Sequence, residues 1–482
     1  MSVRDEKAKV QHLSWRAGFG AEPAYINKWD HKNWNHFFRK VMKGGEKAPK
    51  PITVPESEDV LKYMTESIPY KKRTAEMKKE NQMANGTGMR NLILSWIDEM
   101  AATDHPLREK MAFFWHGHFA CRINNVLFNQ RMLDVIRQNA LGNFGDLLFG
   151  ISKSPAMLQF LNNQENRKQH ANENFGREVM ELFTMGIGNY TEEDVKQGSR
   201  AFTGWGYNKE GEFVFRKNQH DDGVKTFLGK TGNFNGNDIL NIILEQKATA
   251  HHVTDKICRF FVNDHPDPDM VNDLSAKLYE NNYDISSLME SLFKSAEFYK
   301  PENTGNLIKS PVELLVGMRR TIPVDFGKEQ VQILLQRIMD QVPFYPPNVG
   351  GWPGGKDWID SSTLLFRMRL PQIIYYSGEI TVRPKDMPDE LTNTYTKKNP
   401  SDEFVRNFAR RVDATVNWDS YLDSFKDIPE DQLPTTIADA LLTDAQKADS
   451  ALLNKFADHS STENYIKSLS IDIMSSPEYQ LC

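Results

Sequence analysis

The sequence is 482 residues long, and its 39% hydrophobic and 26% charged residues exclude a chain that is disordered throughout. A formal net charge of -6, from 65 acidic and 59 basic residues mixed along the chain, does not indicate a protein that binds nucleic acid or an anionic membrane. The three cysteines lack the paired spacing of a zinc site or a disulfide framework, so they favour a reducing compartment.

The amino-terminal stretch carries charges where a secretory signal would need its apolar centre. Elsewhere no apolar run approaches the roughly 20 residues of a membrane-spanning helix. If Met1 is the natural start, these features predict a cytoplasmic protein without a membrane span.

The first 88 residues are expected to form short helices separated by two loops. These loops are a basic, proline-containing stretch over residues 40–60 and a polar stretch over residues 71–89. From Met89 onward apolar residues recur three and four apart, which predicts longer helices. The first of these span residues 90–102, 106–119 and 125–140.

The next segments predict two helices and a hairpin. Thr191 followed by Asp194 resembles a capping box and starts the second helix, while two glycines mark the end of the first. The two helices cover residues 172–186 and 191–202. Residues 212–215 alternate in polarity after a Lys-Glu-Gly turn, which predicts a small β-hairpin.

Helical periodicity then continues to residue 378, interrupted by a loop rich in proline and glycine over residues 343–362. We predict a mainly α fold: a multi-helix globular domain with a small β-hairpin insertion. The expected parts are an amino-terminal helical region (1–88), a core helical domain (89–380), a linker (381–400) and a carboxy-terminal helical region (401–482).

His116 and His118 follow an aromatic run and could bind a metal ion. Residues two apart on a helix diverge by about 200°, so sharing one ion would require the helix to end there. The alternative is that the imidazoles form hydrogen bonds inside an aromatic core.

Glu178 and Glu181 lie beside the apolar stripe of the helix expected over residues 172–186. A carboxylate at the border of a core needs a partner, which could be a metal ion or an arginine such as Arg177 or Arg200. Structural ion pairing is the alternative to a catalytic role.

The segment after the expected hairpin places His220, Asp221 and Lys225 within six positions. Such a loop offers a metal ligand, a general base and a cation for an anionic group. The alternative is a polar turn that simply makes a bend.

Trp352 and Trp358 lie in the proline- and glycine-rich loop and could form a platform for sugar rings or a lid over a cleft. They could equally pack inward as part of the core. No P-loop, Gly-x-Ser-x-Gly elbow, His-Glu-x-x-His or dinucleotide fingerprint occurs, so no nucleotide cofactor is expected.

A series of segments in a characteristic order resembles the bacterial domain-of-unknown-function family DUF1800 over roughly residues 10–375. The segments are QHLSWRAGFG, REKMAFFWHGHF, NENFGREVMELFTMGIGNYTEEDV, SRAFTGW, HDDGVKTFLG, TDKICRFFV, KSPVELLVGMRR and PPNVGGWPGGKDWIDSSTLLFR. The resemblance implies a fold but no assigned activity. It also implies that relatives are often exported and found beside a family resembling sulfatases, which suggests a sulfatase-like partner. Phe183 stands where many relatives have histidine.

Motif order and side-chain chemistry together favour a metal-assisted, hydrolase-like enzyme with a zinc, iron or manganese ion. The expected metal ligands are His116, His118, Glu181 and His220; the expected catalytic residues are Glu178, Asp221 and Arg177; and the expected substrate-binding residues are Lys225, Trp352 and Trp358. Three alternatives remain open: a non-catalytic helical scaffold, a metal-dependent oxidoreductase and a carbohydrate-binding protein.

Overall fold

The computed structural model describes residues 3–20, 34–43, 48–380, 382, 412–444 and 454–482. Within them the chain is mainly α-helical, with only short two-stranded antiparallel sheets, as predicted. No helix in this part of the chain is both long enough and apolar enough to cross a membrane.

The helices of the first third are α1 (Val3–Arg16), α3 (Trp34–Lys43), α4 (Glu56–Thr65), α5 (Ala75–Ala102), α6 (Pro106–His118), α7 (Val126–Asn139), α8 (Phe144–Ser152) and α9 (Pro155–Phe160). The middle third contains α10 (Asn174–Glu178), the π-helix η3 (Val179–Thr184), α11 (Glu192–Ala201), α12 (Gly236–Leu244), α13 (Lys247–Phe261), α14 (Pro268–Glu280) and α15 (Ile285–Lys294). The last third contains α16 (Pro311–Thr321), α17 (Val331–Ile338), α18 (Ser361–Tyr375), α20 (Asp419–Asp423), α21 (Leu433–Leu441) and α23 (Thr462–Met474).

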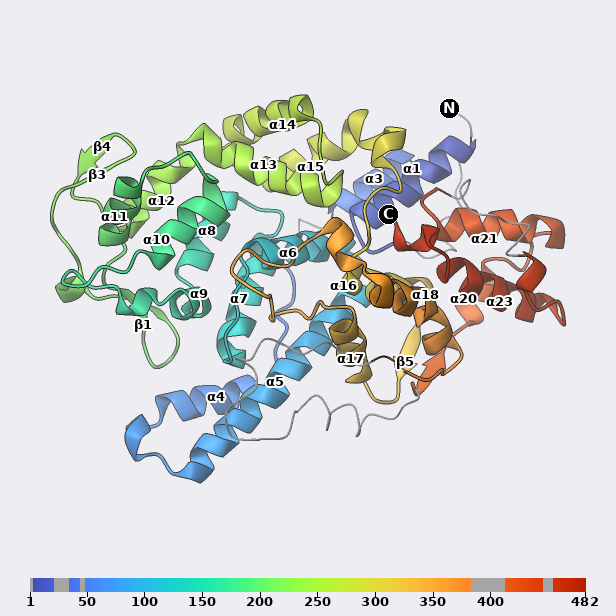
Figure 1. The fold of residues 1–482 in the computed structure, drawn as a ribbon, viewed down its shortest axis with the longest axis horizontal. Coiled ribbons are helices and arrows are strands. Elements are labelled where there is room, and N and C mark those ends of the chain that lie inside the picture. Colours follow the sequence, from blue (N-terminus) through green and yellow to red (C-terminus); the bar gives the residue numbers. More distant parts are fainter. Residues whose placement is uncertain (1–2, 21–33, 44–47, 381, 383–411, 445–453) are drawn as a thin grey trace.

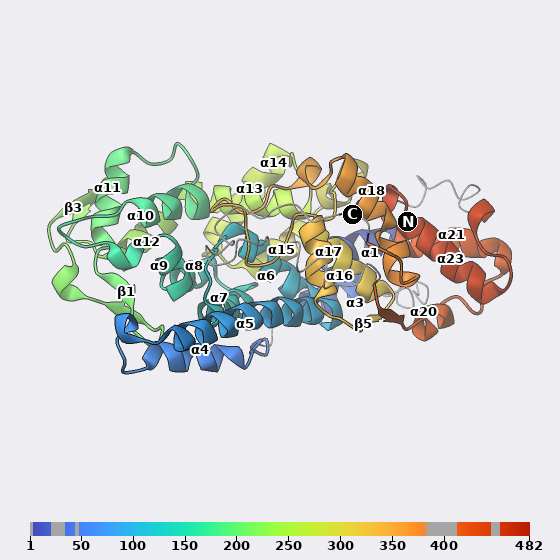
Figure 2. The same cartoon turned by 60° about the horizontal axis from the view of Figure 1, so that its bottom comes forward.

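The molecule is elongated. Figure 1 shows α8 to α12 at one end, α20, α21 and α23 at the other, and α6 and α16 near the middle. The hairpin of α4 and α5 runs along one side, as the turned view in Figure 2 shows. The middle of the molecule is therefore where segments from distant parts of the sequence meet.

The prediction of a loop over residues 71–89 is wrong, because α5 begins at Ala75. Thr74 caps this helix by accepting a hydrogen bond from the Met77 amide at 3.2 Å. Gly88 lets α5 approach its neighbours, since a Cβ at this position would lie only 2.9 Å from the Glu56 Cβ. The sequence suggested a loop because Gly88 serves helix packing and not a turn.

The predicted hairpin is confirmed as β1 (Trp205–Tyr207) paired with β2 (Phe213–Phe215). Two further antiparallel pairs were not predicted: β3 (Lys225–Phe227) with β4 (Lys230–Gly232), and β5 (Val324–Phe326) with β6 (Ala414–Val416). Each strand has only three residues, which is too short to show a period of two.

Two hydrophobic clusters form the core, and α1 contributes to both. Leu13 packs in the larger cluster, whereas Trp15 packs in the second. The second cluster joins α16 to α18 with α20 to α23, for example through Leu314 and Leu469. The carboxy-terminal helices therefore pack on α16 to α18; of the linker predicted at 381–400, only residue 382 lies among the described residues.

Candidate functional site

A cavity of about 410 Å³ lies between α6, α13, α16 and the loop that contains Trp352. Its wall has four basic side chains but only two acidic ones: Arg16, Lys110, Lys256, Arg259, Asp264 and Glu313. Five aromatic side chains also line the cavity, namely Phe113, Phe114, Phe260, Trp352 and Trp358. A cavity of this size, lined by aromatic rings with a few polar groups, is typical of small-molecule sites.

Arg16, the last residue of α1, is 1% exposed at the wall of this cavity. Its Nη2 donates hydrogen bonds to the Asn303 carbonyl at 3.1 Å and to Asn306 Oδ1. Its Nε and Nη1 are buried and have no hydrogen-bond partner among the described residues. Burial lowers the pKa of Arg16, while negative charge at Cys482, Glu313 and Asp264 opposes that shift.

The turn after Arg16 is fixed by close packing. A Cβ at Gly18 would lie 2.9 Å from the Pro106 Cβ, and Gly20, with φ of +92°, rests against the Trp15 ring. The Ala-Gly-Phe-Gly sequence thus holds the end of α1 against the start of α6. This packing directs Arg16 toward the cavity.

Lys110 of α6 forms a buried ion pair with Glu313 of α16 and donates to the Trp15 carbonyl at 3.3 Å. Glu313 also accepts from the Ser310 amide in the capping box that begins α16. Burial opposes ionisation of Glu313, but Lys110 and Ser310 outweigh it, so its pKa lies below the ordinary value. The Glu313 carboxylate on the cavity wall is therefore already paired.

Two further cations lie behind the wall. Lys309 Nζ lies 3.5 Å from the Trp15 ring centroid and 3.9 Å from that of Tyr479, and burial lowers its pKa to about 7. Arg367 donates to the Lys309 carbonyl and to Gln480 Oε1, and burial lowers its pKa to about 10. Basic side chains therefore gather around Glu313, but burial weakens the protonation of Lys309 most.

His118 lies on the cavity wall, and its ring is oriented by the π-helix η3. Its Nε2 lies 3.0 Å from the Phe183 carbonyl, which can only accept, so Nε2 carries the proton. His252 contacts the preceding carbonyl, of Leu182, in the same way at 3.2 Å. Carbonyls at a helix end have no intrahelical partner, and the two imidazoles satisfy them.

Burial lowers the pKa of His118 to about 3, and the positive charges of His252 and Lys256 add to this effect. The ring is therefore neutral near pH 7, and its Nδ1 carries a lone pair. Nδ1 forms no hydrogen bond within the described residues and is not among the fully buried atoms. The cavity thus contains an uncharged hydrogen-bond acceptor.

Lys256 and Arg259 come from α13 and differ in their pairing. Arg259 Nε binds Asp255 at 2.7 Å, and its Nη1 donates to the Asp264 carbonyl. Lys256 forms no hydrogen bond or ion pair in the described part of the chain, and burial lowers its pKa. Lys256 is therefore available to a ligand.

The loop predicted to carry an aromatic platform borders the cavity. Gly351, with φ of +87°, brings the loop so close to α6 that a Cβ would lie 2.5 Å from the Gly117 carbonyl. Trp358 is 7% exposed, whereas Trp352 is half-buried and stacks on His116 with ring centroids 5.4 Å apart. Both tryptophans line the cavity.

His116 and His118 both belong to α6 and have different partners. His116 Nε2 accepts a hydrogen bond from the Phe344 amide at 3.1 Å, and its ring packs against Trp96 and Phe344. Burial lowers the pKa of His116 to about 3. His116 therefore supports Trp352 from behind.

The acidic residues predicted near the helix over 172–186 do not line the cavity. Glu181 accepts a hydrogen bond from the Tyr190 hydroxyl at 2.6 Å, and Arg177 pairs with Glu192 at 2.7 Å. The pKa of Glu178 is raised, first by burial and then by the charge of Glu181.

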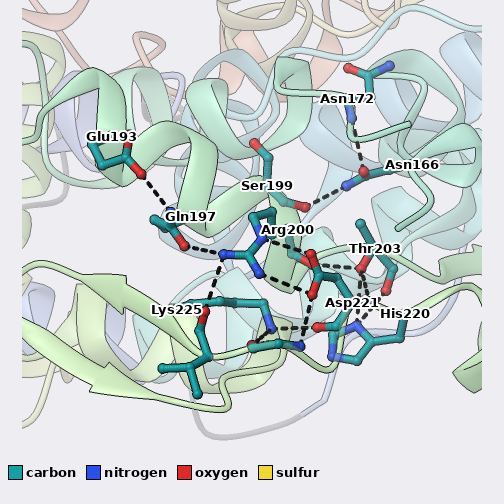
Figure 3. A network of polar contacts seen from close by, with 12 residues as sticks. Asn166, Asn172, Glu193, Gln197, Ser199, Arg200, Thr203, His220, Asp221 and Lys225 are labelled. Atoms are coloured by element: carbon teal, nitrogen blue, oxygen red, sulfur yellow. Dashed lines mark hydrogen bonds and ion pairs between the residues drawn. The ribbon is translucent and has the colours of Figure 1, made fainter. Parts of the chain in front are cut away.

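His220, Asp221 and Lys225 form a separate network around Arg200, shown in Figure 3. Asp221 accepts two hydrogen bonds from Arg200, at 2.7 and 3.1 Å. His220 Nδ1 lies 3.0 Å from the Thr203 carbonyl, and Lys225 donates to the carbonyls of Asp221 and Gly223. None of the three lines the cavity.

Of the ten site residues predicted from sequence, His118, Trp352 and Trp358 are thus the ones that meet at the cavity. Among the described residues, no three His, Cys, Asp or Glu side chains gather as metal ligands would. The divalent metal ion stays a prediction.

The basic residues of the cavity were missed as site residues. Arg16, Lys110 and Lys256 lie inside segments used for the family resemblance, each beside apolar residues that the helical period places in the core. A charged residue on an apolar helix face was the available signal, and it was noticed only for Glu178 and Glu181.

A family model described as "Protein of unknown function (DUF1800)" matches residues 12–481, a range that includes every charged side chain of the cavity wall. Comparison with curated proteins gives no match, and neither does comparison with solved structures.

Proposed function

The chain belongs to the DUF1800 family, to which no activity is assigned, and from its own residues we propose that the central cavity binds an anionic ligand. The observation that carries this proposal is Lys256, a basic side chain that forms no hydrogen bond or ion pair among the described residues, on a cavity wall that also contains the buried guanidinium of Arg16. An ammonium group without a carboxylate partner can bind an anionic group through charge-assisted hydrogen bonds.

The other charges of the cavity support the same proposal. The carboxylate of Glu313 is engaged by Lys110, and Lys256 has no carboxylate partner among the described residues. An anionic group at Lys256 would therefore meet a cation without an ion-pair partner among the described residues. The charge of Arg16 adds to this attraction, although negative charge at Cys482, Glu313 and Asp264 partly offsets it. The low dielectric of a cavity strengthens that attraction.

The test is calorimetric titration of the full chain with inorganic phosphate, sulfate and acetate. We expect saturable binding to one site, weakened about tenfold by Lys256→Gln because a charge-assisted hydrogen bond is lost. Lys71→Gln is the matched control, since this lysine is exposed on the short helix Tyr70–Lys72. Folded protein that binds none of the three anions would reject the proposal.

Metal-assisted hydrolysis is a second candidate, and one observation favours it. The ring of His118 donates its Nε2 proton to a backbone carbonyl and keeps Nδ1 free of hydrogen bonds to the described residues, an arrangement typical of histidines that bind metal ions. A bound zinc or manganese ion would activate water, and iron would instead support oxidation.

Elemental analysis of tag-free protein tests this candidate. Near-stoichiometric metal that is lost in His118→Ala but kept in His459→Ala would support it, since His459 is an exposed histidine near α23. Folded protein that takes up no zinc, iron or manganese would reject it. In that case, a ligand that binds to the protein without being converted to a product would support the alternative of a non-catalytic scaffold.

A further inference from the structure

The cavity wall joins two kinds of surface. Arg16, Lys110 and Glu313 supply its charges from α1, α6 and α16, while Trp352 and the rings of Phe114 and Phe260 supply an aromatic part. A simple inorganic anion would use only the charged part. The aromatic part would therefore contact the rest of the ligand, and its chemistry indicates what that rest is.

Trp352 is held in a fixed orientation from one side. Its indole stacks on the His116 imidazole at an interplanar angle of 22°, and the Phe344 amide anchors that imidazole. Because His116 covers one face of the indole, the cavity can be bordered only by the opposite face or the edge. An aromatic face carries partial negative charge and attracts the weakly positive C–H groups of a saturated ring.

The polar groups beside this surface fit a hydroxyl group and an anionic group. The neutral His118 offers Nδ1 as an acceptor, and a fully ionised phosphate or carboxylate has no proton to donate to it. Lys256 offers donors and no acceptor. A hydroxyl group can therefore donate to His118, while an anionic group accepts from Lys256.

Resting on the proposed anion site, we infer that the ligand is an acidic saccharide. Its pyranose ring packs on Trp352, a hydroxyl group donates to His118 Nδ1, and its carboxylate or phosphate binds Lys256. Carboxylate and phosphate present the same chemistry to an ammonium group, and the titration below distinguishes them.

The experiment is calorimetric titration with glucuronate, glucose 6-phosphate, glucose, acetate and inorganic phosphate. We expect one acidic sugar to bind at least about tenfold more tightly than both glucose and its own ring-free anion. The preferred acidic sugar identifies the anionic group. Trp352→Ala should remove this advantage without changing the affinity for the ring-free anion, and Trp352→Phe should keep most of it.

Tyr376→Ala, at a residue 56% exposed after α18, is the control for a lost aromatic side chain and should change nothing. Should Trp352→Ala fail to fold, saturation-transfer NMR on the unmodified protein replaces it, and the sugar C–H protons should receive the strongest transfer. Ring-free anions that bind as tightly as acidic sugars would overturn the saccharide inference and leave the anion site standing. Absence of any anion binding would instead reject the proposed function itself.

Discussion

Lys110 and Glu313 form a buried ion pair although 203 residues separate them in the sequence. The pair joins α6 to α16 at the wall of the central cavity. Glu313 also belongs to the capping box of α16, in which its side chain accepts a hydrogen bond from the Ser310 amide. One contact therefore connects the fold to the candidate site.

Lys110→Met should destabilise the protein by about 3–5 kcal/mol, because it leaves the Glu313 carboxylate buried without its cation. The double variant Lys110→Met/Glu313→Gln should lose less than the sum of the two single variants, since the uncompensated charge is then absent. Urea unfolding of all four proteins measures the coupling. Strictly additive losses would show that the pair contributes nothing as a pair.

Acid should destabilise the protein through its buried imidazoles. Burial lowers the pKa of His116 from 6.5 to about 3, so between these values the unfolded chain binds a proton that the folded chain does not. Stability from this group is therefore complete above pH 6.5 and is lost as the pH falls toward 3. In His116→Gln the slope of the unfolding free energy against pH should decrease, because about one proton fewer is taken up on unfolding. An unchanged slope would contradict the shift.

Gly351→Ala should displace the loop that carries Trp352. The backbone at Gly351 has φ of +87°, and the new Cβ would lie 2.5 Å from the Gly117 carbonyl. We expect a loss of about 1–3 kcal/mol in stability and weaker ligand binding. Gly354→Ala is the matched control for stability, because a Cβ added there would meet no atom of the described residues within 4 Å and its φ of -112° suits alanine. Equal effects of both variants would contradict this account.

Asp221→Asn tests whether the network around Arg200 is independent of the cavity that contains His118. The Asp221 carboxylate holds Arg200 through two hydrogen bonds, and Arg200 in turn keeps the pKa of Asp221 below the ordinary value. We expect a stability loss of about 1–3 kcal/mol and unchanged anion binding. The measurements are urea unfolding and calorimetry on the same sample. Anion binding that disappears from a folded Asp221→Asn protein would place this loop in the functional site after all.

Much of the fold could be predicted from sequence because helices are local structures. Apolar periodicity located α6 and α7, and Thr191 with Asp194 located the start of α11, whose capping box is present in the structure. The polar beginning of α5 was not predicted, because it depends on Gly88 fitting against α4 and α7. Propensity could not show that contact.

Which residues share the candidate site depends on the tertiary structure. The sequence by itself predicted a helix over residues 106–119 that carries His116 and His118, and a proline- and glycine-rich loop that carries Trp352 and Trp358. Only the packing of α1, α6, α13 and α16 decided that Arg16 and Lys256 share a cavity with His118, whereas Asp221 pairs with Arg200 elsewhere. The physical reason is that a charge near the core is neutralised by whichever partner the fold brings within hydrogen-bond distance, and that partner lies far away in the sequence.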